Sequence, residues 1–385
     1  MALLHPTVFG GPLERPWSRR YLELTASGCP MLMQALDPQN LPLMPMATMS
    51  APVKWGVVKI INLPFTITKN EIYVFLGRHA RVIEGPAISI LMNRATAKTM
   101  ETYVEFEMPS DAKHFVERYN DPKNKKRRRP SIGDRPVVME VSSQEAFMAK
   151  LFPKAHCVSW TGQEPVVHPP ADPSTAGFRG FLTKEEIVMT VKHAETPQRS
   201  PYVDKCPQRP YESFVSTLVK FPWWEDTLIT LELRDQMFWA AERLTTILMN
   251  QMRKGVPGLE QGLLFELVGA VVKTPGFSEA QKYRVCVSAG MSGREFGLAP
   301  YAHAWPFATL TKKEETEPDV LKLYAALIRE ATVPFADQGN PEKDWSPFGN
   351  FVVPWPANAA QMTLREASIL ELNTFEYYLR QVLPQ

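Results

Sequence analysis

The strongest constraint on the fold is a regular order of strand-like and helix-like segments between residues 56 and 143. Short β-branched or alternating runs are typical of strands. The first helix-like segment starts with Thr68 and carries Glu71 three positions later, which is a capping box. Ser110 is expected to cap the second helix. The order is strand, helix, strand, strand, helix, strand, over residues 57–62, 68–79, 87–92, 100–107, 110–119 and 135–143. This βαββαβ order predicts a four-stranded antiparallel sheet with two helices on one face.

Two of the strands carry motif-like sequences. The first strand reads VKIINL over residues 58–63 and runs into Pro64, and the third reads TMETYVEF over residues 99–106. With GDRPVVMEV before the end of the fourth strand, these residues resemble the RNA recognition motif (RRM) family. The resemblance covers roughly residues 52–143. It implies single-stranded RNA as a ligand, because members of this family stack bases on aromatic side chains of the sheet.

The motifs of the first and third strands depart from the family pattern in a specific way. Lys59 and Glu101 stand where the family has stacking aromatics, and only Tyr103 remains. By strand alternation Phe106 is expected in the core. The pattern is similar to the quasi-RRMs of hnRNP F and H proteins, which bind single-stranded, G-rich RNA through loops. The resemblance implies these candidate RNA-binding residues: Lys59, Ile61, Asn62, Phe65, Arg94, Lys98, Glu101 and Tyr103.

A strongly basic run, KNKKRRR, occupies residues 123–129 before the fourth strand. Its candidate residues are Lys125, Lys126, Arg127, Arg128 and Arg129. One interpretation is contact with RNA phosphates. A second is a nuclear import signal, which predicts a nuclear protein and leaves shuttling to the cytoplasm open. A third is an inert solvated loop.

The outer face of the sheet allows two interpretations. Ile61, Tyr103 and Val138 should point outward, where they either bind bases or are covered. A helix expected over residues 144–152 can cover them, with Phe147, Met148, Leu151 and Phe152 as its apolar side chains. If it does, the loops are left as the RNA site, or the RRM binds protein. Trp55 is expected to anchor the edge of the domain rather than to stack on a base.

Five segments are predicted along the chain. Their boundaries are 1–52 (an irregular Pro- and Met-rich lead), 53–155 (the RRM-like domain with an extra helix), 156–182 (a Pro-rich linker), 183–300 (an α-helical domain) and 301–385 (a Pro-rich segment with two further helices). The fold class is therefore α+β, with a mainly α-helical region after the sheet. Helices are expected over 183–195, 227–253, 259–272, 278–291, 319–331 and 363–383, and the paired aromatics Trp223-Trp224 and Phe238-Trp239, with Trp305, should fill a helical core.

Composition and motifs limit the function classes. The formal net charge is +2, so a nucleic-acid signal must be local, and 35 prolines indicate long irregular connections. The four cysteines are widely spaced, which indicates free thiols. We expect no membrane span, no secretory signal, no cofactor, no metal site and no enzyme activity, because the chain lacks phosphate-loop, nucleophile-elbow and zinc motifs.

The sequence thus predicts an RNA-binding protein in mRNA processing or post-transcriptional regulation, with single-stranded RNA as its partner. The helical half is expected to bind proteins or to clamp the RRM. The alternative is a protein-interaction adaptor whose degenerate RRM binds protein instead of RNA. A weaker third hypothesis is an enzyme fused to an RRM, with its site in residues 183–385.

Overall fold

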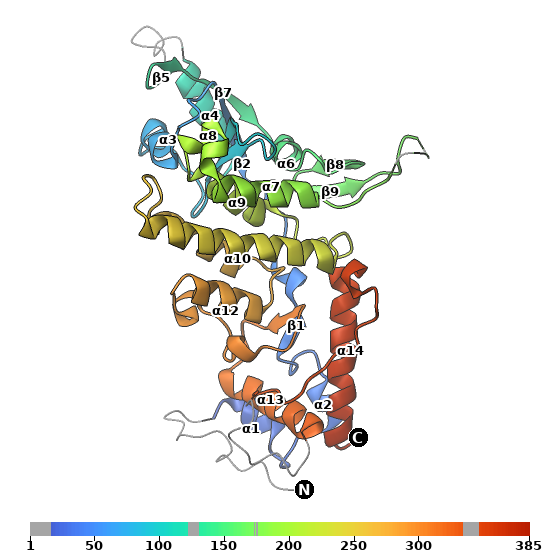
Figure 1. Cartoon of the computed structure of the whole chain (residues 1–385). Coiled ribbons are helices and arrows are strands. Elements are labelled where there is room, and N and C mark those ends of the chain that lie inside the picture. The colour runs from blue at the N-terminus through green and yellow to red at the C-terminus, as the bar shows by residue number, and fades with distance from the viewer. Residues whose placement is uncertain (1–16, 122–130, 173, 175, 334–345) are drawn as a thin grey trace.

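A four-stranded antiparallel sheet forms the upper part of the molecule (Figure 1). The structure is a computed structural model that describes residues 17–121, 131–172, 174, 176–333 and 346–385. The sheet has the order β3-β4-β2-β7. Its strands and their two connecting helices are β2 (Gly56–Ile61), α3 (Lys69–Leu76), β3 (Ile88–Met92), β4 (Thr99–Phe106), α4 (Pro109–Asn120) and β7 (Val138–Ser142). The predicted α+β class, element order and antiparallel sheet are confirmed.

The inner face of the sheet packs on α3 and α4. Strand alternation sends Val58, Ile60 and Phe106 to this side, where they are fully buried. The predicted core position of Phe106 is therefore confirmed, as is the capping box of Thr68 and Glu71. The expected cap at Ser110 is wrong: α4 begins one residue earlier, at Pro109, because proline's fixed φ suits the first helical position.

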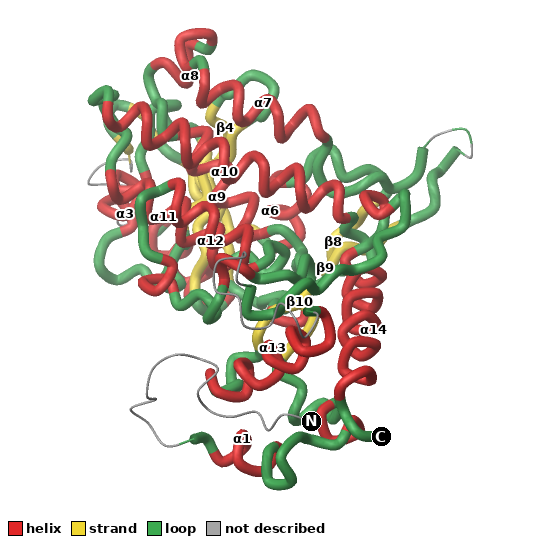
Figure 2. The backbone as a smooth tube through the Cα atoms, turned by 60° about the horizontal axis from the view of Figure 1, so that its bottom comes forward, coloured by secondary structure: helices red, strands yellow, loops and turns green. Residues whose placement is uncertain are grey.

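The outer face of the same sheet packs on helices. The crossing helices are α6 (Gln144–Leu151) and α9 (Arg209–Lys220), and α9 contacts β3. Behind them lie α7 (Lys184–Glu195), α8 (Pro201–Asp204), α10 (Leu231–Arg253), α11 (Gln261–Lys273) and α12 (Glu279–Ser288). One hydrophobic core contains sheet residues Val57, Leu91 and Tyr103 together with side chains of these helices. Figure 2 shows helices α7, α9 and α10 in front of the strands. The four-stranded sheet and the helical region therefore share a core.

Residues 156–182 contain regular structure, which corrects the prediction of a plain linker. A hairpin forms from β8 (Val158–Thr161) and β9 (Glu164–Val167), turning at Gly162 with a φ of 64°. Trp160 packs on Phe152 with ring centroids 5.8 Å apart. Both strands have four residues, and most of these are exposed, so the sequence carries only a weak hydrophobic pattern from which to predict them.

The lower part of the molecule combines both ends of the chain. Described residues 17–52 are not an irregular lead: Leu24, Leu32 and Leu43 are buried in a second core. The elements here are α1 (Arg19–Leu24), α2 (Leu32–Ala35), β1 (Leu43–Pro45), β10 (Leu310–Lys312), α13 (Pro318–Thr332) and α14 (Leu364–Val382). Strand β1 pairs with β10, more than 260 residues away. No local sequence pattern predicts a pairing between strands so far apart in the chain. For this reason residues 17–52 were wrongly predicted to be irregular.

The remaining elements are short. They are a hairpin of β5 (Ser131–Ile132) and β6 (Arg135–Pro136), and the 3₁₀ turns η2 (Met46–Met49), η3 (Pro197–Arg199), η4 (Gly293–Phe296), η5 (Ala302–Ala304) and η7 (Ala359–Gln361). Among the described residues, no helix has the length and apolar character that crossing a membrane requires.

The aromatic residues of the helical half divide into two groups. Trp223, Phe238 and Trp305 are buried, as predicted for a helical core. Trp224 is only half-buried, and Trp239 is 44% exposed. Trp224 and Trp239 each follow a buried aromatic residue in the chain. The prediction that both members of each pair are buried was therefore wrong for the second member.

Candidate functional site

The single stacking aromatic of the sheet is covered by the chain itself. Tyr103 is 1% exposed, and its ring lies on that of Phe147 from α6 with centroids 4.7 Å apart and planes 12° apart. Burial raises the pKa of the Tyr103 hydroxyl. Of the two interpretations of the outer face, covering by residues 144–152 is confirmed, and Tyr103 cannot stack on a base in this arrangement.

A strip of the outer face stays open along β2 and β7. Ile61 pairs with Val138, and Lys59 pairs with Glu140, across these two strands. Val138 is 46% exposed, and Ile61 is half-buried. The Lys59 ammonium lies 4.0 Å from the Glu140 carboxylate. Lys59 is partly exposed and Glu140 is exposed, and an ion pair at that distance in such a position contributes little to stability.

Glu101 lies beside the covering helix. Its carboxylate is 4.0 Å from the ammonium of Lys150 on α6, across the boundary between the sheet and the helix. Lys150 is exposed, so this ion pair contributes little to the position of α6.

The loop after β2 is fixed by contacts within the chain. Asn62 has a φ of 66°, and its Nδ2 donates a hydrogen bond of 2.7 Å to the carbonyl of Pro136. The Phe65 ring meets that of Tyr202 from α8 edge-on, with centroids 5.8 Å apart. Asn62 remains exposed, whereas Phe65 is half-buried against the helical half. Only part of the Phe65 ring is therefore accessible.

Arg94 is buried in the interface with the helices, which corrects its assignment as an RNA contact. It is 9% exposed, and its guanidinium donates to Glu186 of α7 at 3.1 Å and to Thr217 of α9 at 3.0 Å. Burial lowers the pKa of Arg94, and the charge of Glu186 acts against that effect. Its loop neighbour Lys98 is exposed. The basic residues Lys125, Lys126, Arg127, Arg128 and Arg129 lie outside the described residues.

A buried ion pair joins the sheet to α9. Lys220 and Glu105 are both nearly inaccessible, and the ammonium donates to the carboxylate at 2.5 Å. Gln144 of α6 donates to the same carboxylate oxygen at 2.7 Å. The Lys220 ammonium also lies 4.7 Å from the centre of the Trp55 ring, a cation–π contact. Burial lowers the pKa of Lys220, and Glu105 opposes this.

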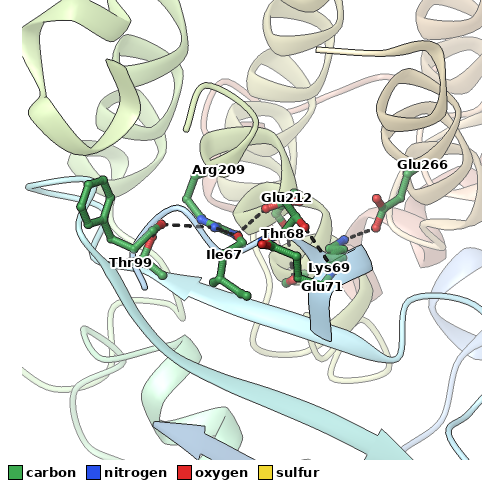
Figure 3. A network of polar contacts seen from close by, with 10 residues as sticks. Ile67, Thr68, Lys69, Glu71, Thr99, Arg209, Glu212 and Glu266 are labelled. Carbon is green, nitrogen blue, oxygen red and sulfur yellow. Dashed lines mark hydrogen bonds and ion pairs between the residues drawn. The ribbon is translucent and has the colours of Figure 1, made fainter. Parts of the chain in front are cut away.

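A second polar network fastens the β2–α3 loop to the helices (Figure 3). Arg209, at the start of α9, donates to the carbonyl of Ile67 and to Glu212 at 2.5 Å. Lys69 of α3 forms an ion pair with Glu266 of α11. Ile67 lies in the loop and Lys69 is the first residue of α3. Their contacts with Arg209 and Glu266 therefore set the position of α3 against α9 and α11.

A groove of about 790 Å³ opens beside this network. Its walls come from residues 49–55, the start of α3, α9 and α11, with Trp223 and Trp224 at one end. Most of the lining is apolar. Its exposed large side chains include Met49, Tyr73 and Phe265, which are 50%, 39% and 48% exposed. The volume lies in the range of small-ligand and peptide pockets, about 300–1,000 Å³.

Several of these residues were missed by sequence reasoning. Lys220 and Arg209 lie in a segment to which no element was assigned, and α9 is buried at every position except Val219. The segment nevertheless carried helix signals: Pro210 and Glu212 near its start, and the helical spacing of its apolar residues Tyr211, Phe214, Val215 and Leu218. Within the described part of the chain, no three His, Cys, Asp or Glu side chains gather as metal ligands.

Two family models match separate parts of the chain. A domain of unknown function (DUF8400) matches residues 54–162, and another (DUF8399) matches residues 178–291. The first range spans the four-stranded sheet and α6, and the second spans α7 to α12. No curated protein matches the chain. The crystal structure of the Glorund qRRM2 domain is similar to part of it, at 25% identity and a TM-score of 0.21, covering 25% of this chain and 98% of that one. A TM-score this low does not establish a shared fold.

Proposed function

We propose that the chain is an RNA-binding protein with one degenerate RRM, in which the sheet face serves the core and RNA contact has moved to the β2–β7 edge. The observation that supports this is the strip of Lys59, Ile61 and Val138, which the covering helices leave accessible. Exposed Arg135 lies at the end of this strip, where its guanidinium reaches the carbonyl of Leu63 at 3.5 Å.

The basic run adjoins this edge in the chain. Helix α4, which packs on the inner face, ends at Asn120 and strand β5 begins at Ser131, and residues 123–129 lie between them in the sequence. Six basic residues in seven positions offer phosphate contacts with little sequence preference. If about four of them contact single-stranded RNA, log affinity falls with log salt concentration with a slope near −3.

The test is fluorescence anisotropy of the full chain with short G-, U-, A- and C-rich RNAs across a salt series. One variant replaces Lys125, Lys126, Arg127, Arg128 and Arg129 by glutamine. The matched control replaces Arg253 and Lys254, two exposed basic residues at the end of α10. We expect the first variant to lose affinity and most of the salt slope, and the control to keep both. An equal loss for each charge removed, five in the first variant and two in the control, would reduce the interaction to overall charge.

A second candidate function is a protein-interaction adaptor. One observation favours it: the surface that an RRM uses for bases is occupied by the chain's own helices α6 and α9. For an adaptor, RNA affinity should not exceed that of a free basic peptide with the sequence of residues 121–131. The anisotropy series with this peptide as a reference separates the two functions.

We also propose a nuclear location and a role in mRNA processing, both resting on the sequence of residues 125–129 and on the RRM resemblance. A fluorescent fusion of the full chain should concentrate in the nucleus. Its glutamine variant at these five positions should spread into the cytoplasm. An even distribution of the unchanged fusion would remove the import signal from the account.

A further inference from the structure

The groove beside α11 is not used by the proposed RNA contact. It lies on the α3 and α9 side of the sheet unit, and the open strip follows strand β7 on the opposite edge of the sheet from β3. Its floor includes Val215 and Leu218 of α9, and its rim carries the exposed rings of Tyr73 and Phe265. A groove with an apolar floor and aromatic rims is suited to apolar side chains of a ligand.

Two glycines of α11 line the groove. Gly262 lies in the first turn and Gly269 in the interior, and a Cβ built on either one meets no atom within 4 Å. Interior glycine disfavours a helix relative to alanine, and no close contact within the chain requires it here. The spacing of seven residues puts both glycines on one face, along the helix axis. At these two positions no side chain projects from α11 into the groove.

The charges of the lining argue against a nucleic acid in the groove. Three lysines and three glutamates line it: Lys69, Lys220, Lys273, Glu212, Glu260 and Glu266. Four of these are held in ion pairs within the chain, because Lys69 pairs with Glu266, Lys220 with Glu105, and Glu212 with Arg209. A polyanion requires an excess of positive charge, and this lining has none.

The two remaining charges mark the ends of α11. Glu260 precedes the first residue of the helix, Lys273 is its last residue, and both are exposed. At 1.5 Å per residue they are about 20 Å apart along the helix. This charge separation prefers a ligand with a cation at one end and an anion at the other, with uncharged residues between them.

We propose that this groove binds an apolar peptide segment of a partner protein, lying along α11 with a basic residue at the Glu260 end and an acidic residue at the Lys273 end. Anchor side chains of the peptide enter the groove between Tyr73 and Phe265, and its backbone passes close to Gly262 and Gly269. The proposal is independent of RNA binding, because no residue of the basic run or of the β2–β7 strip takes part.

The test uses a displayed library of random 16-residue peptides selected on the immobilised full chain. Selected sequences are synthesised with a fluorophore, and their affinity is measured by anisotropy. Three variants are compared with the unchanged chain: Gly262→Leu with Gly269→Leu to fill the groove, Glu260→Lys with Lys273→Glu to reverse its ends, and Gly269→Ala as a fold control.

We expect selected peptides to share a central apolar stretch with opposite charges at its ends. Filling the groove should weaken binding at least tenfold, and reversing the end charges should favour the peptide with its charged ends exchanged. The Gly269→Ala chain should melt at a temperature at least as high as the unchanged chain, which shows that the glycine does not serve the fold. Absence of selected peptides, or equal affinity for the filled variant with an unchanged melting temperature, would overturn the proposal. RNA affinity should be equal in all these variants.

Discussion

The ring of Tyr103 lies parallel to the ring of Phe147 with centroids 4.7 Å apart, so the chain supplies its own aromatic partner on the outer face of the sheet. Both side chains are essentially inaccessible and belong to the core that continues into helices α7, α9, α10 and α11. Tyr103 therefore serves packing within the chain. Contact with an external ligand has to come from other surfaces.

Replacing Arg94 by alanine should destabilise the fold by about 3–5 kcal/mol, because it leaves the Glu186 carboxylate and Thr217 at a buried interface without their donor. Urea unfolding measures the change. Lys98→Ala is the matched control, since Lys98 lies exposed on the same loop and should change stability by less than about 0.5 kcal/mol. Arg94 would return as an RNA contact if its alanine variant kept full stability and lost RNA affinity.

The Lys220–Glu105 pair makes a prediction about coupling. Lys220→Met alone should lower the free energy of unfolding by about 3–5 kcal/mol, because a buried carboxylate loses its counter-charge. Adding Glu105→Gln should recover a large part of this loss, since the remaining group is neutral and still reaches Gln144. A double-mutant cycle by urea unfolding gives the coupling energy. Additive losses would mean that the two charges do not depend on each other.

Sequence reasoning recovered the elements whose signals are local. The capping boxes at Thr68, Thr183 and Thr363 each start the expected helix. It missed α9 although Tyr211, Phe214, Val215 and Leu218 have helical spacing, and it missed the β1–β10 pair because the partners are far apart in the chain. Strand alternation correctly placed Tyr103 on the outer face. The apolar residues of segment 144–152 correctly indicated a helix that covers this face. It could not show that α9 completes the cover, or that Arg94 points into the resulting interface.

The shared core predicts that the sheet unit will not be an independent domain. A fragment of residues 53–170 exposes Leu91 to water and leaves Glu105 without Lys220. We expect it to bind the dye ANS and to melt without a cooperative transition, whereas the full chain melts cooperatively. A fragment that melts cooperatively at the temperature of the full chain would show that the helical half only rests on the sheet.

Glu371 gives a prediction about pH. Its carboxyl is fully buried and accepts hydrogen bonds from the backbone of Ala308 and Thr309, at 2.5 and 2.7 Å. Burial raises its pKa above the ordinary 4.5. A pKa that is higher in the folded chain means that the unfolded chain loses this proton first. The stability contributed by the protonated group is therefore present below about pH 4.5 and is lost as pH rises through the folded value.

The measurement for Glu371 is urea unfolding across this pH range in the unchanged chain and in Glu371→Gln. Glutamine does not titrate, so the free energy of unfolding of the unchanged chain should fall relative to that of Glu371→Gln as pH rises. Other carboxyl groups contribute equally to both chains and cancel in the difference. A difference independent of pH would show that the proton affinity of Glu371 is the same in the folded and unfolded chains.

The central proposal is that RNA contact involves the β2–β7 edge and the basic run of residues 123–129, while the sheet face around Tyr103 serves the core. The most direct measurement is the RNA affinity of four full-length chains by anisotropy. They are the unchanged protein, the glutamine variant of residues 125–129, Tyr103→Phe, which keeps the stacked ring and removes only the hydroxyl, and Tyr103→Leu, which removes the ring. Both Tyr103 variants are first shown to be folded by thermal melting. We predict that affinity and salt slope fall in the glutamine variant and stay unchanged in both Tyr103 variants. Loss of affinity in folded Tyr103→Leu, with the glutamine variant unaffected, would contradict the account and return the sheet face to RNA.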